Sequence, residues 1–325
     1  MTIFLLLCGL VLLVIGGELL VRGAVAIAGK LGVSPLMIGL TIVGMGTSMP
    51  ELAASLQAAL AGSPGIALGN IVGSNIANSL LILGVAALLA PIAVARGTLW
   101  RDGGVALLAA CALLAVGLTT GLGRTAGFAL IVLMIGYLVL AYVQERRAAA
   151  QNAAFAKAAA LGSVDTALDP AAEKQPGWAM SLAFLLAGLG FIVGGGTLLV
   201  DAAVKLAIEF GMSETLVGLT IVAVGTSLPE LVTSAVAAIR KQSEVALGNV
   251  LGSNIYNVFF IGGVTGVIAP SEVPESIVRF DLPVLIVLSI VVMAMAWTGA
   301  RLSRIEGLCL IGAYGVYLAF TAGLI

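Results

Sequence analysis

The stretch that decides the fold is residues 39–84, which read GLTIVGMGTSMPELAASLQ (39–57), a short turn, and GIALGNIVGSNIANSLLILG (65–84). A closely similar sequence recurs at residues 218–263, as GLTIVAVGTSLPELVTSAV (218–236) and EVALGNVLGSNIYNVFFIGG (244–263). A shift of 179 residues superimposes the copies without a gap, so that Glu51 falls on Glu230. Each copy places one carboxylate beside a Gly/Ser/Thr/Pro break inside a very apolar run. We therefore expect the function to rest on this pair of segments.

The composition is that of a helical membrane protein. The chain has 325 residues, of which 61% are hydrophobic and only 10% are charged, with a mean hydropathy of +1.18. A water-soluble surface needs more charge than this, and apolar runs of about 20 residues recur along the whole length. The net charge of −1 gives no case for a nucleic-acid partner. The three cysteines are dispersed and histidine is absent, so we expect neither a disulfide framework nor a transition-metal cofactor.

The apolar runs predict an all-α polytopic fold of ten membrane spans in two halves. The predicted spans cover residues 3–29, 33–61, 66–90, 103–120, 124–144, 178–209, 213–239, 244–268, 281–299 and 303–323. Residues 1–144 and 178–325 form the two five-span halves. The polar, Ala-rich residues 145–177 are expected to be a cytoplasmic linker with some helix at its start.

Lys and Arg predict the orientation. With the N-terminus outside, eleven basic residues lie at cytoplasmic ends and three at outer ends, which places both termini outside. Because the copies are five spans apart, an odd number, the second copy enters the membrane from the opposite side. The sequence thus predicts an inverted-topology repeat, an architecture of secondary transporters, with the first and sixth spans equivalent.

Counting residues puts both carboxylates near the membrane midplane. Glu51 lies eleven residues before Gly62 at one surface, and Glu230 lies eleven before Lys241 at the other. At ~1.5 Å per residue both are ~16 Å deep. An acidic residue at this depth costs about 2.5–3.5 kcal/mol, and no Lys or Arg is expected there. We infer that a proton or a bound cation supplies the compensating charge.

The neighbouring residues indicate which cation. A mid-span proline in each copy predicts a broken helix with free carbonyls, and we expect breaks in the second, third, seventh and eighth spans. The other candidate ligands are hydroxyl and amide oxygens, from Thr47, Ser48, Ser74, Asn75, Asn78, Thr226, Ser227, Ser253, Asn254 and Asn257. An all-oxygen set selects hard ions such as Ca²⁺ or Na⁺. Asn70 and its copy are interpreted as interhelical contacts or ligands. Glu18–Arg22 and Asp201–Lys205 are predicted to be i,i+4 salt bridges.

At this point the motifs match a known family. GTSMPEL with GNIVGSNIAN, and GTSLPEL with GNVLGSNIYN, resemble the two alpha-repeats of the cation/calcium antiporter superfamily, in particular its prokaryotic sodium/calcium exchanger branch. The motifs are long and doubled, and the resemblance covers essentially the whole chain. It implies a secondary active transporter, not an enzyme, that exchanges Na⁺ for Ca²⁺ by alternating access. It also implies that the first and sixth spans slide to open the site to alternate sides.

The resemblance also implies roles for individual residues. Glu51 and Glu230 would be the central ligands of Ca²⁺ and Na⁺, joined on Ca²⁺ by the carbonyls of Thr47 and Thr226. Asn78 and Asn257 would face each other at the centre. The Na⁺ positions would be completed by Ser48, Ser74, Ser227 and Ser253 and by the carbonyls of Gly44 and Ala223.

Asn257 is a departure, because some relatives carry Asp there and in the potassium-dependent branch that Asp is tied to K⁺. We therefore expect electrogenic, K⁺-independent exchange that extrudes Ca²⁺, by a monomer in the inner membrane of a bacterium or archaeon. No cofactor is expected, and the partners are the two ions and the lipid bilayer. One alternative is a Ca²⁺/H⁺ or other divalent cation/H⁺ antiporter. The alternative from another class is a cation channel.

Overall fold

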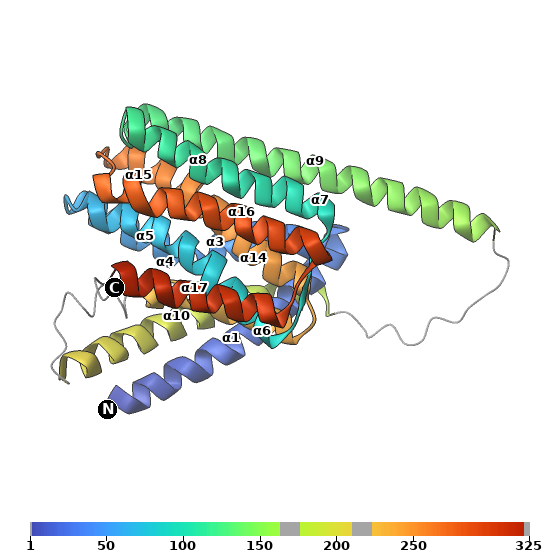
Figure 1. Ribbon diagram of the computed structural model, residues 1–325. Helices are drawn as coiled ribbons and strands as arrows, with labels where there is room; N and C mark the ends of the chain where they lie inside the picture. The colour runs from blue at the N-terminus through green and yellow to red at the C-terminus, as the bar shows by residue number, and fades with distance from the viewer. Residues whose placement is uncertain (1, 163–175, 210–222, 322–325) are drawn as a thin grey trace.

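The computed structural model describes residues 2–162, 176–209 and 223–321, and these ranges form a bundle of helices (Figure 1). The first half contains α1 (Thr2–Leu31), α2 (Pro35–Ile38), η1 (Gly39–Val43), α3 (Gly44–Thr47), α4 (Met49–Leu60), α5 (Pro64–Ala77), η2 (Asn78–Ile82), α6 (Leu83–Leu89), α7 (Arg96–Thr98), η3 (Leu99–Gly103), α8 (Gly104–Thr119) and α9 (Arg124–Gly162). The second contains α10 (Trp178–Glu209), α12 (Ala223–Thr226), α13 (Leu228–Ile239), α14 (Ser243–Ile255), η5 (Tyr256–Gly262), α15 (Gly263–Ile268), η6 (Ile277–Asp281), α16 (Leu282–Gly299) and α17 (Arg304–Thr321). The η elements are π-helical turns.

Within the described residues, seven helices are long and apolar enough to cross a membrane, and the bent pair Leu36–Thr47 and Met49–Leu60 makes an eighth span. These eight agree with eight of the ten predicted spans. The predicted span 213–239 lies partly outside the described residues, which retain its second part as α13. α17 is not among the eight, and it begins with the charged residues Arg304 and Glu306. The helix expected at the start of residues 145–177 is present, because α9 continues to Gly162.

Two spans form the centre of the bundle. Pro64–Leu89 and Ser243–Ile268 are each 78% buried, whereas Leu99–Thr119, Arg124–Gln144 and Ile277–Gly299 are each only 28% buried. Leu68 and Ile71 of the first central span and Ile255 and Phe259 of the second belong to one large apolar core. The outer helices leave many large apolar side chains exposed, which suits a surface that faces lipid rather than water.

The predicted helix break is present between α3 and α4, where the two segments meet at an angle of 43°. Ser48 has non-helical torsions (φ −85°, ψ 8°), and Ser227 has nearly the same ones (φ −89°, ψ 8°) between α12 and α13. Pro50 and Pro229 follow in the first turn of the next helix, where the missing N–H costs no hydrogen bond.

The breaks expected in the third and eighth spans are not found. Both helices run on without interruption and contain a π-helical turn, η2 and η5, at matching positions. Neither span has a proline in its interior, so every backbone N–H remains available for a helical bond. A π turn holds one more residue than an α-helical turn, because its hydrogen bond spans five residues instead of four, and the helix continues through it. Such turns are frequent at functional sites.

Short β pairings repeat the 179-residue shift. β1 (Ile92–Ala93) pairs antiparallel with β2 (Arg301–Leu302), with Ala93 opposite Arg301. Leu122 and Ser271 form an isolated antiparallel bridge. Shifted by 179 residues, Leu122 corresponds to Arg301, while Ser271 corresponds to Ile92. Because Ile92 itself pairs with Leu302, nearly the same contact between halves is made twice, displaced by one residue, at opposite ends of the helix Leu99–Thr119.

The buried acid–tyrosine contacts also occur in both halves. Asp102 is fully buried, accepts a 3.1 Å hydrogen bond from the hydroxyl of Tyr137 and binds the guanidinium of Arg101 (2.6 and 2.8 Å). Asp281, 179 residues later, accepts a 2.9 Å hydrogen bond from Tyr317. Each contact fixes an outer helix to its neighbour. The two aspartates correspond at the 179-residue shift, whereas the counterpart of Tyr137 is Val316, the residue before Tyr317.

Glu18 forms the predicted ion pair with Arg22, and it also pairs with Arg240 at the end of α13. Asp201 and Lys205 are both exposed on α10, and within the described ranges no ion pair joins them. The long-range contact to Arg240 was not predicted, because sequence spacing reveals only partners on the same helix.

α1 and α10 lie side by side at the edge of the bundle (Figure 1) and meet through glycines. A Cβ at Gly16 would lie 2.9 Å from the carbonyl oxygen of Gly188, and one at Gly188 would lie 2.8 Å from the carbonyl oxygen of Gly16. The two backbones are therefore in direct contact, as small residues permit between membrane helices.

We predict that Gly188→Ala destabilises the protein, because its methyl group has no room against the α1 backbone. The expected cost is about 1–3 kcal/mol, typical of overpacking. Gly194→Ala is the matched control in the same helix, since a Cβ there meets nothing within 4 Å. Thermal unfolding in detergent measures both. A Gly188→Ala protein as stable as Gly194→Ala would contradict the close packing.

Candidate cation-binding site

Glu51 and Glu230 lie in the first turns of α4 and α13, directly after the two helix breaks. Each glutamate is only 1% exposed. The first turn of a helix carries unpaired N–H groups and the positive end of the helix dipole, which favours a carboxylate. The break therefore serves two purposes, since it creates a helix start inside the bundle and puts the glutamate on it.

The two glutamates are held by serines of the opposite half. The Ser48 hydroxyl, at the first break, donates a 2.9 Å hydrogen bond to Oε1 of Glu230. The Ser227 hydroxyl, at the second break, donates a 3.1 Å hydrogen bond to Oε1 of Glu51. Ser253 adds a 3.4 Å hydrogen bond to Glu230 Oε1. These crossed bonds bring both carboxylates into one site.

Several oxygen atoms at this site make no hydrogen bond within the protein. Oε2 of Glu51, Oε2 of Glu230 and Oδ1 of Asn257 are buried without a partner, as are both polar side-chain atoms of Asn78. Buried polar atoms are nearly always paired, so unpaired carboxylate oxygens mark positions where a ligand binds. Within the described residues, neither glutamate forms an ion pair. The site thus has negative charge, free oxygens and no basic partner, which fits a cation as substrate.

The remaining predicted residues surround the two glutamates. Thr47, Ser74 and Ser253 are buried, and the Ser74 and Ser227 hydroxyls are 3.5 Å apart. The Gly44 carbonyl already accepts hydrogen bonds from the Ser48 N–H (3.1 Å) and the Thr47 hydroxyl (3.3 Å). Thr226 is half-buried at the end of α12, and Ala223 begins that helix. Residues 218–222 of the second motif lie outside the described residues.

Asn78 and Asn257, expected to face each other, are not joined by a hydrogen bond. Asn257 donates from Nδ2 to Oδ1 of Asn75 (3.0 Å), and Asn75 donates from its own Nδ2 to the Asn254 carbonyl (3.1 Å). Asn254 in turn donates from Nδ2 to Ser79 (3.0 Å). This chain of amides links the two central helices across the bundle. It leaves the Asn78 side chain unengaged beside the glutamates.

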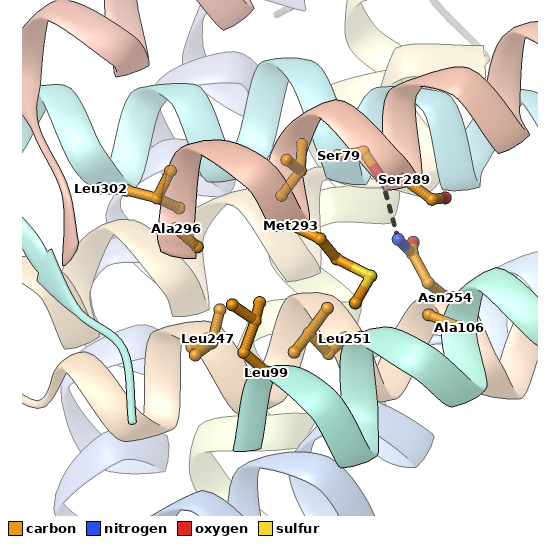
Figure 2. A pocket seen from close by; sticks show the side chains of 12 residues that line it. Ser79, Leu99, Ala106, Leu247, Leu251, Asn254, Ser289, Met293, Ala296 and Leu302 are labelled. Carbon is orange, nitrogen blue, oxygen red and sulfur yellow. Dashed lines mark hydrogen bonds between the residues drawn. The ribbon is translucent and has the colours of Figure 1, made fainter. Parts of the chain in front are cut away.

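A small cavity of about 20 Å³ lies beside this amide chain (Figure 2). Figure 2 shows Asn254 and Ser79 hydrogen-bonded at its edge, with Leu251 and Met293 among the apolar side chains that line it. Its volume suffices for about one water molecule. No charged residue lines this cavity, so it offers a cation none of the charge that the two glutamates provide.

Two pairs of residues at the site were missed or left undecided from the sequence. Asn70 donates from Nδ2 to the Glu51 carbonyl and to Ser55, and Asn249 does the same to the Glu230 carbonyl and Ser234. The signal was present, because all four residues are identical in the two copies at the 179-residue shift. Ser55 and Ser234 follow their glutamates by one helical turn and so point to the same face.

Comparison with known proteins agrees with this reading. The family described as "Sodium/calcium exchanger protein" matches residues 1–143 and 180–323. The sodium/calcium exchanger MaX1 of Methanosarcina acetivorans is 35% identical over 336 residues, covering 96% of each chain. The inner membrane protein YrbG of Escherichia coli is 35% identical over 319 residues, covering 97% of this chain and 95% of its own.

Solved structures of the sodium-calcium exchanger NCX_Mj have the same fold. One of them, soaked with Na⁺ and Ca²⁺, superimposes with a TM-score of 0.81 and 31% sequence identity. The match covers 98% of this chain and 97% of that chain. The resemblance read from the two motifs is thereby confirmed along nearly the whole length. The chain belongs to the sodium/calcium exchanger family of membrane cation antiporters.

Proposed function

We propose that this protein exchanges Na⁺ for Ca²⁺ across the membrane by alternating access, with Na⁺ entry driving Ca²⁺ extrusion. The observation that carries the proposal is the pair of buried glutamates, each bonded through Oε1 to a serine of the other half and each with Oε2 unpaired. MaX1 and NCX_Mj, which this chain resembles, are named sodium/calcium exchangers.

Charge matching explains why the two ions compete. One Ca²⁺ neutralises both carboxylates, and so do two Na⁺ ions, so either load removes the cost of bare charge inside the membrane. An unloaded site keeps two unpaired negative charges, which opposes movement through the membrane. A transporter of this kind changes conformation only when loaded, which prevents leak. A load of more than two Na⁺ per Ca²⁺ makes the exchange electrogenic.

The ligand set suits these ions. Glu51 and Glu230 are the central ligands, and the carbonyls of Thr47 and Thr226 complete the Ca²⁺ position. The Na⁺ positions draw on further oxygens, from Ser48, Ser74, Ser227, Ser253, Asn78, Gly44 and Ala223. Ca²⁺ accepts six to eight oxygens in loose geometry, which such a set supplies. Asn257 contributes a neutral amide, so no additional negative charge favours K⁺.

An inverted-topology repeat of ten spans supports alternating access. The mirrored β pairings at opposite ends of one span are what such a repeat produces. The excess of basic residues at one set of helix ends favours both termini outside in a bacterial or archaeal inner membrane.

Equivalent glycines of α1 and α10 differ in how closely the rest of the bundle packs against them. A Cβ at Gly17 of α1 would lie 2.9 Å from Val236 of α13, whereas one at Gly196, the counterpart on α10, would meet nothing closer than 3.9 Å. Gln57, the α4 counterpart of Val236, is exposed. In the proposed orientation, the residues that the structure describes are closed toward the cytoplasm and uncovered toward the outside.

Our first functional prediction concerns the two carboxylates. In proteoliposomes, an imposed Na⁺ gradient is expected to drive ⁴⁵Ca²⁺ flux at clamped pH, with or without K⁺. Glu51→Gln and Glu230→Gln should each lower this flux at least about 100-fold, because a single buried carboxylate cannot balance Ca²⁺. Glu272→Gln, in an exposed loop, is the control with normal flux.

The same assay separates the alternatives. Ca²⁺ flux that follows a pH gradient and ignores Na⁺ would identify a Ca²⁺/H⁺ antiporter. Ohmic Ca²⁺ current without any counter-ion would identify a channel. Normal Na⁺-driven flux in both glutamine variants would contradict the assigned site.

A second functional prediction uses the ion pair between α1 and α13. Glu18 binds Arg240 at the end of α13 and Arg22 of its own helix, so of these two ion pairs only the one with Arg240 joins α1 to the cytoplasmic end of α13. Both side chains are partly exposed, and such pairs contribute up to about 1 kcal/mol. Arg240→Gln should therefore shift the population away from the state uncovered toward the outside by up to about 5-fold.

Labelling from the outside measures this shift. In a background without Cys8, Cys111 and Cys309, Gln57→Cys reports whether that face of α4 is uncovered. A membrane-impermeant maleimide should label it more slowly in Arg240→Gln and normally in the matched control Arg22→Gln. Equal labelling of all three proteins would contradict a role of the ion pair in the access equilibrium.

A further inference from the structure

Asn70 of α5 and Asn249 of α14 occupy equivalent positions, and the charge-matching mechanism does not use them as ligands. Asn249 is fully buried and Asn70 is half-buried. The two side chains make the same set of contacts, which indicates a common role for the pair.

Within its own half, each amide holds the helix that carries the glutamate. Nδ2 of Asn70 lies 3.2 Å from the Glu51 carbonyl oxygen and 2.9 Å from the Ser55 hydroxyl. Nδ2 of Asn249 lies 3.2 Å from the Glu230 carbonyl oxygen and 2.9 Å from the Ser234 hydroxyl. Both N–H groups of each amide are therefore used, and Oδ1 of each points away from that helix as an acceptor.

In the opposite half, each amide holds a threonine at the helix break. Thr47 donates a 3.1 Å hydrogen bond to Oδ1 of Asn249, and Thr226 donates a 3.4 Å hydrogen bond to Oδ1 of Asn70. Each asparagine thus joins the glutamate helix of one half to the break of the other. An apolar residue of the same size could pack at these positions but could make neither connection.

These bonds close a ring on each side of the site. Asn70 contacts the Glu51 backbone and Thr226, and Ser227, the next residue, donates to the Glu51 carboxylate. The mirror ring connects Asn249 to the Glu230 backbone and to Thr47, whose neighbour Ser48 donates to the Glu230 carboxylate. A shift of either break therefore moves the carboxylate of the other half, and the amide transmits that shift.

We propose that Asn70 and Asn249 are positioning residues that couple the two halves of the ion site, so that binding at one break sets the ligand geometry at the other. The proposal rests on the proposed function, because it assumes that cations bind between Glu51 and Glu230. Its consequence is that the amides govern ion affinity and the cooperativity of Na⁺ binding.

The test removes the bond between halves with the smallest change of shape. Thr47→Val deletes the hydroxyl that reaches Asn249, together with its longer 3.3 Å contact to the Gly44 carbonyl of its own helix, and keeps the backbone carbonyl and the side-chain volume. Equilibrium binding of ⁴⁵Ca²⁺ to the purified protein should weaken about 5- to 10-fold, the effect of losing one buried hydrogen bond. Thr233→Val is the matched control, because the Thr233 hydroxyl is buried on α13 without a partner. Its Ca²⁺ affinity should stay within about 2-fold of the wild type.

A double-mutant cycle distinguishes coupling from general damage. If Asn249 acts through Thr47, the double variant Thr47→Val/Asn249→Ala should bind Ca²⁺ no more weakly than Asn249→Ala alone. Competition by Na⁺ should also lose cooperativity, with a lower Hill coefficient in Thr47→Val and an unchanged one in Thr233→Val. A purely structural role would leave the Hill coefficient unchanged.

Each outcome has a distinct meaning. The coupling role would be overturned if the losses of Ca²⁺ affinity in the two single variants multiplied in the double variant. It would also be overturned if Thr47→Val had the affinity and the Hill coefficient of the wild type. Either result would leave the proposed exchange function intact. A wild-type protein that binds no Ca²⁺ would instead overturn the proposed function on which the inference rests. The expected result is wild-type binding, weakened non-additively by the two substitutions.

Discussion

The structure depends on two carboxylates buried in the core of the bundle, with no basic partner among the residues that the structure describes. Each costs about 2.5–3.5 kcal/mol at this depth, a cost the fold bears twice. The crossed bonds from Ser48 and Ser227 satisfy only one oxygen of each glutamate, and the other makes no hydrogen bond within the described protein, as the proposed cation site requires. Because each serine belongs to the opposite half, neither half can form the site alone.

The rest of the bundle positions this pair. The two central spans are the most buried helices, and their asparagines and serines surround the glutamates. The proline-containing breaks place helix starts in the interior, where the dipole favours negative charge. The glycine contact lets α1 and α10 lie backbone to backbone beside this core. The helices nearest lipid contribute mainly apolar surface.

The repeat and the composition were sufficient to predict the helical membrane fold, eight of the spans, the break at Ser48 and the family. They could not show that the third and eighth spans bend by π turns, because no residue type marks such a turn. The bonds of Asn70 and Asn249 were also beyond reach, since a repeated asparagine reads equally well as a helix contact. The Glu18–Arg240 pair depends on how α1 lies against α13, which sequence spacing does not encode.

The central claim is that Glu51 and Glu230 form one shared cation site. The anomalous difference map of a crystal grown with Ca²⁺ tests it most directly. The account predicts a Ca²⁺ peak between the two glutamates, within about 2.3–2.6 Å of an oxygen of each. A Ca²⁺ peak bound to one glutamate alone, or located away from both, would contradict it.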